Sequence, residues 1–128
     1  MIKRAFFLGT ILALTLFLGC KKKAEIKLLG TWHLIEVSVD GLTGNGIYVP
    51  VASSKIIKMY DNGYYAANGN LCYMTTEIDE NNSGVYSEGI IHAGDCFQNN
   101  PLTYEINGNE MILHYPCYEA CSHKYIKL

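Results

Sequence analysis

The stretch Gly30-Thr31-Trp32-His33-Leu34-Ile35-Glu36-Val37 decides the fold that we expect for this chain. It contains the only tryptophan, and every segment with the composition of a folded domain follows it. Trp32 and Leu34 share one face of a predicted strand over residues 31–39, whereas Ile35 and Val37 fall on the other. Either both faces contact apolar groups, or a β-bulge near Ile35 reconciles the two patterns.

The segment before this strand has the features of an export signal. Lys3 and Arg4 precede an apolar run of about 15 residues, which is shorter than the roughly 20 that span a bilayer as a helix. The run ends in Leu16-Phe17-Leu18-Gly19-Cys20, which resembles the bacterial lipobox, although Phe17 replaces the usual leucine. The resemblance implies a lipidated Cys20 as the mature N-terminus, whereas the alternative is a permanent membrane anchor. We predict a signal peptide over 1–19, a lipidated tether over 20–27 and one domain over 28–128.

The cysteine count supports the same compartment. Of five cysteines, lipidation of Cys20 with acyl chains such as palmitate leaves four, which is enough for two disulfides in an oxidising envelope. We favour the pairs Cys117–Cys121 and Cys72–Cys96, with a longer-range Cys96–Cys117 pairing as the alternative. If the strands alternate in direction, all four lie at one end of the domain, opposite Trp32.

The predicted domain is acidic. After residue 27 the sequence has 4 basic and 11 acidic residues, a net charge of −7 with histidine neutral. This charge argues against nucleic acid and against a domain face on anionic lipid, although it also serves solubility. We therefore expect membrane attachment through the N-terminal lipid alone, in a bacterial cell envelope. The outer membrane is favoured, and the membrane face stays open.

The domain is expected to be all-β. Short apolar segments alternate with turns such as Asp61-Asn62-Gly63 and Asn107-Gly108-Asn109, and one long loop covers residues 40–54. This pattern predicts a small antiparallel up-and-down barrel of about eight short strands, since closure removes exposed edges. The predicted strands are residues 31–39, 55–60, 64–67, 71–79, 85–92, 102–106, 111–115 and 123–128.

Several of these segments resemble the lipocalin-like domains of bacterial lipoproteins. The similarity covers 28–128 and lies in Gly30-x-Trp32, the long loop, the Asn107-Gly108-Asn109-Glu110-Met111 turn, Lys55-Ile56-Ile57-Lys58-Met59-Tyr60-Asp61-Asn62-Gly63-Tyr64-Tyr65 and Tyr125-Ile126-Lys127-Leu128. The four cysteines depart from the family pattern. The resemblance implies that the tryptophan packs at the closed end of the barrel and that the interior binds a small hydrophobic or amphipathic ligand. The candidate ligand-binding residues are Trp32, Tyr60, Tyr65, Tyr73, Tyr86 and Tyr104.

We expect a binding protein and not an enzyme, with no cofactor and no metal. Glu77, Asp79 and Glu80 cluster at a turn, where a solvated surface explains them. The spacing His114-x-x-Cys117-x-x-x-Cys121-x-His123 offers zinc ligands, but an oxidising compartment favours disulfides over thiolates. No nucleophile motif or phosphate loop is present in the sequence.

Two function classes remain from the sequence. Either the barrel binds a small apolar ligand, or it is filled by its own side chains and acts as an interaction or inhibitor module toward an envelope protein. In the second class, exposed apolar residues of the rim loops form the contact. Those candidates are Ile47, Tyr48, Val49, Val51 and Tyr118.

Overall fold

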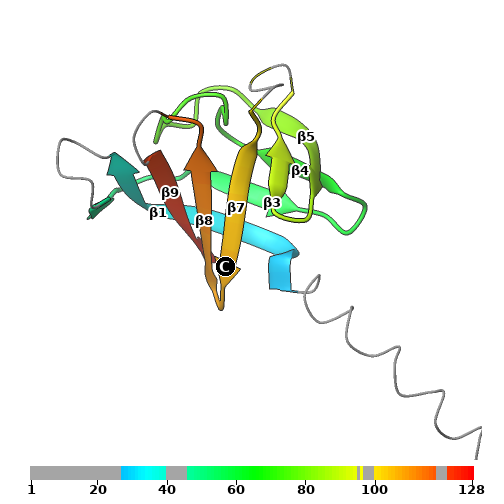
Figure 1. The fold of residues 1–128 in the computed structure, drawn as a ribbon, viewed down its shortest axis with the longest axis horizontal. Coiled ribbons are helices and arrows are strands. Elements are labelled where there is room, and N and C mark those ends of the chain that lie inside the picture. The colour runs from blue at the N-terminus through cyan, green and yellow to red at the C-terminus, as the bar shows by residue number, and fades with distance from the viewer. Residues whose placement is uncertain (1–26, 40–45, 95, 97–99, 118–120) are drawn as a thin grey trace, which may run out of the picture.

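The computed structural model describes residues 27–39, 46–94, 96, 100–117 and 121–128, which form an antiparallel β-barrel (Figure 1). β1 hydrogen-bonds to β3 and β9, so eight strands close the barrel, and β2 adds a short ninth beside β1. This confirms the predicted all-β up-and-down barrel. The strands are β1 (Gly30–Val39), β2 (Tyr48–Pro50), β3 (Ile56–Met59), β4 (Tyr64–Ala67), β5 (Asn82–Ser87), β6 (Ile90–His92), β7 (Leu102–Asn107), β8 (Glu110–Tyr115) and β9 (Cys121–Lys127).

A bulge in β1 sets which side chains enter the barrel. The register between β1 and β9 shifts between Leu34 and Glu36, so the predicted bulge near Ile35 is confirmed. Trp32 and Leu34 are fully buried before the shift, and Val37 packs against the core after it. Because the extra residue reverses the alternation, Val37 faces the same interior as Trp32 and Leu34.

One end of the barrel, here called the tryptophan end, is closed by Trp32. Its indole nitrogen Nε1 donates a hydrogen bond to the carbonyl oxygen of Leu28 at 2.8 Å, and Leu28 is itself buried. Gly30 has a φ of 124°, which favours glycine, and a Cβ there would lie 3.1 Å from the Lys127 side chain. The turns β3–β4, β5–β6 and β7–β8 lie at this end.

The opposite end, here called the cysteine end, carries both disulfides. Cys72 is bonded to Cys96, with a Cα–Cα distance of 5.6 Å, and Cys117 is bonded to Cys121, with a distance of 6.0 Å. This is the pairing that we favoured from the sequence. Strand direction places all four residues away from Trp32, as the alternation of strands predicted.

The predicted strand over residues 71–79 does not form. Residues 68–81 are an irregular loop whose backbone finds side-chain partners in place of a neighbouring strand. Asp79 Oδ1 accepts the backbone N–H of Asn70 at 2.9 Å, and Asn70 Oδ1 accepts that of Cys72 at 2.7 Å. Short polar side chains compete with strand pairing in this way, which explains why residues 71–79 do not form the expected strand.

The predicted strand over residues 85–92 is two strands. β5 and β6 pair with each other through a turn at Glu88 and Gly89, and Gly89 has a φ of 74°. One predicted strand is therefore missing and another is divided, so the number of barrel strands stays at eight. The strand directions beyond this point also stay as predicted.

We expect the longer cross-link to contribute more to stability than the shorter one. The double variant Cys72→Ser/Cys96→Ser should have a free energy of unfolding lower by about 3 kcal/mol, because this bond closes the larger loop of the unfolded chain. The double variant Cys117→Ser/Cys121→Ser should lower the free energy of unfolding by about 2 kcal/mol. Urea denaturation of both double variants measures the difference, and a larger loss for the second pair would contradict the prediction.

Candidate functional site

Five buried side chains in the barrel interior end in polar groups. They come from the residue before β3 and from β4, β8 and β9, and they are at most 7% exposed. We call this set the interior polar cluster: Lys55, Tyr65, Tyr115, His123 and Tyr125. Tyr115 pairs with Cys121 across β8 and β9, so the cluster begins directly beneath the cysteine end.

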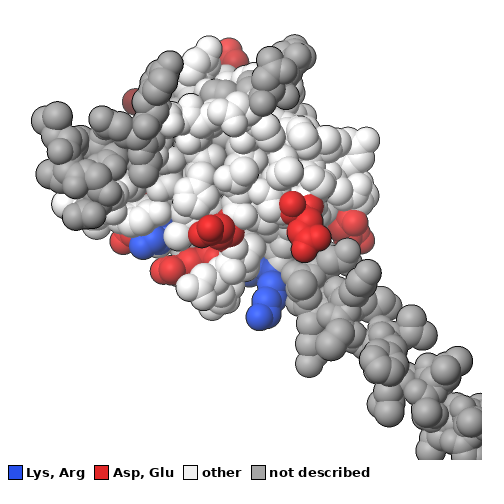
Figure 2. Space-filling model, in the orientation of Figure 1, with Lys and Arg blue, Asp and Glu red and all other residues white. Residues whose placement is uncertain are grey.

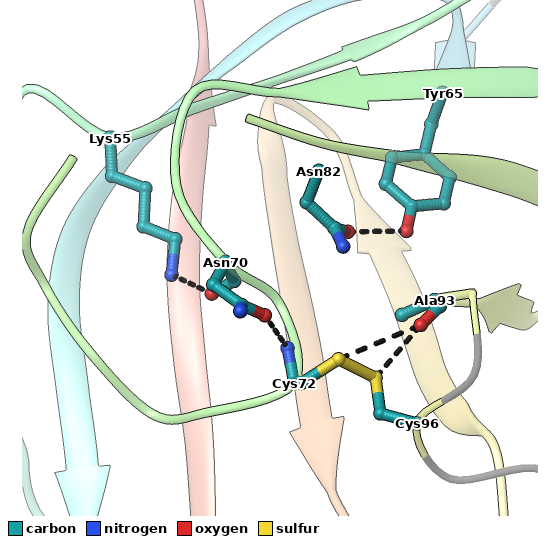
Figure 3. Close-up of a disulfide and its surroundings, with 7 residues drawn as sticks. All are labelled: Lys55, Tyr65, Asn70, Cys72, Asn82, Ala93 and Cys96. Carbon is teal, nitrogen blue, oxygen red and sulfur yellow. Dashed lines mark hydrogen bonds between the residues drawn. A yellow bond between two sulfur atoms is a disulfide. The ribbon is translucent and has the colours of Figure 1, made fainter. Parts of the chain in front are cut away.

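Two members of the cluster have hydrogen-bond partners. The Tyr65 hydroxyl donates to Asn82 Oδ1 at 2.6 Å, and Lys55 Nζ donates to the carbonyl oxygens of Asn70 and Thr75, each at 2.8 Å. Figure 3 shows the Lys55 side chain reaching toward Asn70, beside the disulfide of Cys72. Lys55 therefore fastens the loop 68–81 to the barrel from inside.

The other three members lack such partners. Among the described residues, no hydrogen bond reaches the Tyr115 hydroxyl, the Tyr125 hydroxyl or either ring nitrogen of His123. The His123 ring lies 5.0 Å from the Tyr115 ring and 6.2 Å from the Tyr125 ring, between centroids. A buried polar group without a partner costs about 1–3 kcal/mol, so such groups are normally bonded to protein, water or ligand. The cluster thus has hydrogen-bonding capacity available to a molecule in the interior.

Burial fixes the charges of the cluster. It lowers the pKa of His123 to about 4, with the positive charge of Lys55 as a second cause. It also lowers the pKa of Lys55 to about 8, although the nearby Asp79 carboxylate opposes this shift. Burial raises the pKa of Tyr115 and of Tyr125 above the ordinary value. At neutral pH the imidazole and the phenols are therefore uncharged, and Lys55 is mostly cationic.

The remaining interior is apolar. Fully buried aliphatic and aromatic side chains of β1, β3 and β8 belong to the same core as Tyr65, Tyr115 and Tyr125. An interior with one polar region and one apolar region suits a molecule of the same double character. The side chains concerned include Trp32, Leu34, Ile57, Met111 and Leu113.

Four of the six ligand-binding residues expected from the resemblance are buried or half-buried, and the other two are exposed. Tyr65 lies in the interior polar cluster, and Trp32 closes the tryptophan end. Tyr104 is half-buried and donates its hydroxyl to the Ser87 carbonyl oxygen at 2.8 Å. Tyr86 is likewise half-buried and bonded to the backbone carbonyl of Tyr60.

Tyr60 and Tyr73 were wrong as interior residues. Tyr60 is 39% exposed and Tyr73 is 68% exposed. Tyr60 follows the buried Met59, so strand alternation turns it outward, and Tyr73 lies in the loop that replaced a predicted strand. Neither side chain lines the interior.

Four residues of the cluster were missed from the sequence. Lys55, Tyr115, His123 and Tyr125 were not among the expected ligand-binding residues. The signal that could have found the last three is the alternation Cys121-x-His123-x-Tyr125 in the last strand, opposite Met111-x-Leu113-x-Tyr115. His123 was instead considered only in the spacing that offers zinc ligands.

The other histidines do not join His123. His92 is exposed, and His114 lies 3.6 Å from the exposed Glu105 carboxylate. His33 Nε2 lies 2.5 Å from the Ser53 carbonyl oxygen. In the part of the chain that the structure describes, no three His, Cys, Asp or Glu side chains gather as metal ligands.

The rim residues point in two directions. Ile47 is 69% exposed and Val49 is 56% exposed, whereas Val51 packs against the core. The Tyr48 hydroxyl lies 2.8 Å from Ser122 Oγ, and the Tyr48 ring lies under the Lys124 ammonium.

The charged side chains are unevenly distributed over the surface. On the face shown in Figure 2, the visible Lys, Asp and Glu side chains lie mostly toward the tryptophan end. Among the rim residues, Tyr118 lies outside the described residues.

Comparisons with protein-family models, with curated proteins and with solved structures found no match for this chain. No helix formed by the described residues is long and apolar enough to cross a membrane. Residues 1–26, with the predicted signal peptide and Cys20, lie outside the described residues.

Protonation of His123 should destabilise the fold in acid. Its pKa is about 4 in the folded chain against 6.5 ordinarily, so between these values the unfolded chain binds more protons. The contribution of neutral His123 to the free energy of unfolding is complete above pH 6.5, its ordinary pKa. It falls as the pH drops, with a loss of about 3 kcal/mol by pH 4. The groups facing the ring are Lys55, Tyr115 and Tyr125, and the phenols stay neutral throughout. Urea titrations at pH 7 and pH 4 measure the loss.

A matched pair of variants isolates this effect from surface carboxylates. His123→Gln should remove most of the difference between the two pH values, whereas the exposed His92→Gln should keep it. Equal pH dependence in His123→Gln and the unsubstituted protein would show that this residue is not the cause.

Proposed function

We propose that this protein is a lipid-anchored lipoprotein of the bacterial cell envelope that binds a small amphipathic molecule inside its barrel. One observation carries the proposal: the buried hydroxyls of Tyr115 and Tyr125 and both nitrogens of His123 have no partner among the described residues. A bound molecule with a polar group would satisfy them and repay their desolvation. Its apolar part would contact the aliphatic interior.

We assign the cluster a binding role and not a catalytic one. A general base works best when its pKa is near the working pH, and the pKa of His123 is about 4. Burial raises the pKa values of Tyr115 and Tyr125, so these phenols stay protonated and serve as hydrogen-bond donors. These properties favour fixed recognition of a ligand.

The second candidate is an interaction module at the cysteine end. Ile47 and Val49 are exposed on and beside β2, the one described strand that pairs on a single edge. Exposed apolar side chains next to a strand edge are typical of a surface that another protein covers. In this case the interior would hold water or its own side chains only.

Two phenylalanine variants test whether unpartnered hydroxyls destabilise the interior of the ligand-free protein. In ligand-free protein, Tyr125→Phe should raise the free energy of unfolding by about 1 kcal/mol, because it removes an unpartnered buried hydroxyl. Tyr65→Phe should lower it by about 1 kcal/mol, because that hydroxyl bonds to Asn82. Urea denaturation after extraction and refolding measures both values.

Native mass spectrometry of the mature protein gives the matching ligand readout. A small molecule should remain bound to the unsubstituted protein, and Tyr125→Phe should retain less of it. A destabilised Tyr125→Phe with no bound molecule in either protein would contradict the carrier proposal and favour the interaction module.

The lipid anchor has its own test. Cys20→Ser should abolish acylation, because the acyl chains attach at the thiol of Cys20. The variant should be unlipidated and should leave the membrane fraction. Membrane fractionation and intact mass measure the change, with Cys72→Ser as the control that keeps acylation. A mass that differs only by the substitution itself, with an unchanged membrane fraction, would rule out lipidation at Cys20.

A further inference from the structure

Lys55 is a buried cation without a buried counterion. Its side chain is fully buried, and no Asp or Glu is buried among the described residues. The nearby Asp79 is exposed, and its Oδ1 accepts two backbone N–H groups, from Asn70 and Glu80. Lys55 forms no ion pair with any described residue. A buried charge is normally paired, and the only carboxylate that acts on Lys55 among the described residues is the exposed one of Asp79.

The free groups of the cluster can together donate four hydrogen bonds, although both hydroxyls and one nitrogen of His123 can also accept. The Tyr115 and Tyr125 hydroxyls each offer one O–H, and neutral His123 offers one N–H. Lys55 Nζ has three N–H groups, of which two bond to the carbonyl oxygens of Asn70 and Thr75. One N–H of Lys55 therefore adds to the three donors of the aromatic members.

A carboxylate complements this set in both charge and bonding. Its single negative charge balances that of Lys55, and its two oxygens accept about four hydrogen bonds. A neutral alcohol or amide would leave the cation unbalanced. A phosphate, which carries close to two charges, would exceed it.

We propose that the ligand of this barrel is an amphipathic carboxylic acid, whose carboxylate lies among Lys55, Tyr115, His123 and Tyr125. This inference rests on the proposed ligand-binding function and adds the chemical class of the ligand. The acid group lies beneath the cysteine end, and the hydrocarbon part contacts the apolar interior. Lys55 then bonds both to the ligand and to the loop 68–81.

The test compares octanoate with octanol, which share a chain length and differ in the polar group. Both are titrated by calorimetry into the mature protein in lipid nanodiscs, and empty nanodiscs correct for partition into the bilayer. Octanoate should bind at least about tenfold more tightly than octanol, because charged hydrogen bonds contribute more than neutral ones. Lys55→Met should abolish this preference while octanol still binds.

Two further variants keep the test sharp. Lys58→Met removes an exposed lysine of β3 and should leave the preference unchanged. Tyr125→Phe keeps the cation and removes one donor, so it should weaken octanoate several-fold and octanol less. It serves as the deciding variant if Lys55→Met fails to fold.

The outcomes distinguish the two proposals. Equal affinity for octanoate and octanol in the unsubstituted protein would overturn the acid and leave ligand binding in place. Binding of neither probe, with no molecule retained in native mass spectrometry, would overturn both. A preference for octanoate that survives both Lys55→Met and Tyr125→Phe would place the acid elsewhere.

Discussion

The barrel depends on β1 having hydrogen-bonded neighbours on both of its edges. One edge meets β9 along most of its length, and the other meets first β3 and then β2. A small sheet with open edges would leave backbone groups available to other chains, and this double pairing removes them. The bulge at Ile35 allows β1 to bend from one partner to the next and to keep Trp32, Leu34 and Val37 inside.

The parts of the fold that the sequence predicted are those specified by local chemistry. Gly63 and Gly108 have positive φ values, and the turns around them were predicted from residues that tolerate this conformation. Residues 71–79 were mistaken for a strand because the structure of their loop depends on a distant residue. Lys55 Nζ holds the carbonyl oxygens of Asn70 and Thr75, and no window of sequence around them contains that lysine.

The candidate site was predicted only in part, for a related reason. Tyr65 was expected from the resemblance. The location of the four cysteines followed from strand direction, which was unaffected by one missing and one divided strand. His123 was missed because histidines are infrequently fully buried, and its burial results from the pairing of β9 with both β1 and β8. Pairing across a closed barrel brings together residues that no local pattern connects.

The pairing of β1 with β9 also shapes how the chain reaches its native state. These are the first and last strands described, so the contact that closes the barrel joins residues far apart in sequence. Such long-range pairing is slow to form, on the order of milliseconds to seconds in small all-β domains. Until it forms, the edges of both strands are free to pair with other molecules. The time between synthesis and closure is therefore the period when this protein is most vulnerable to aggregation.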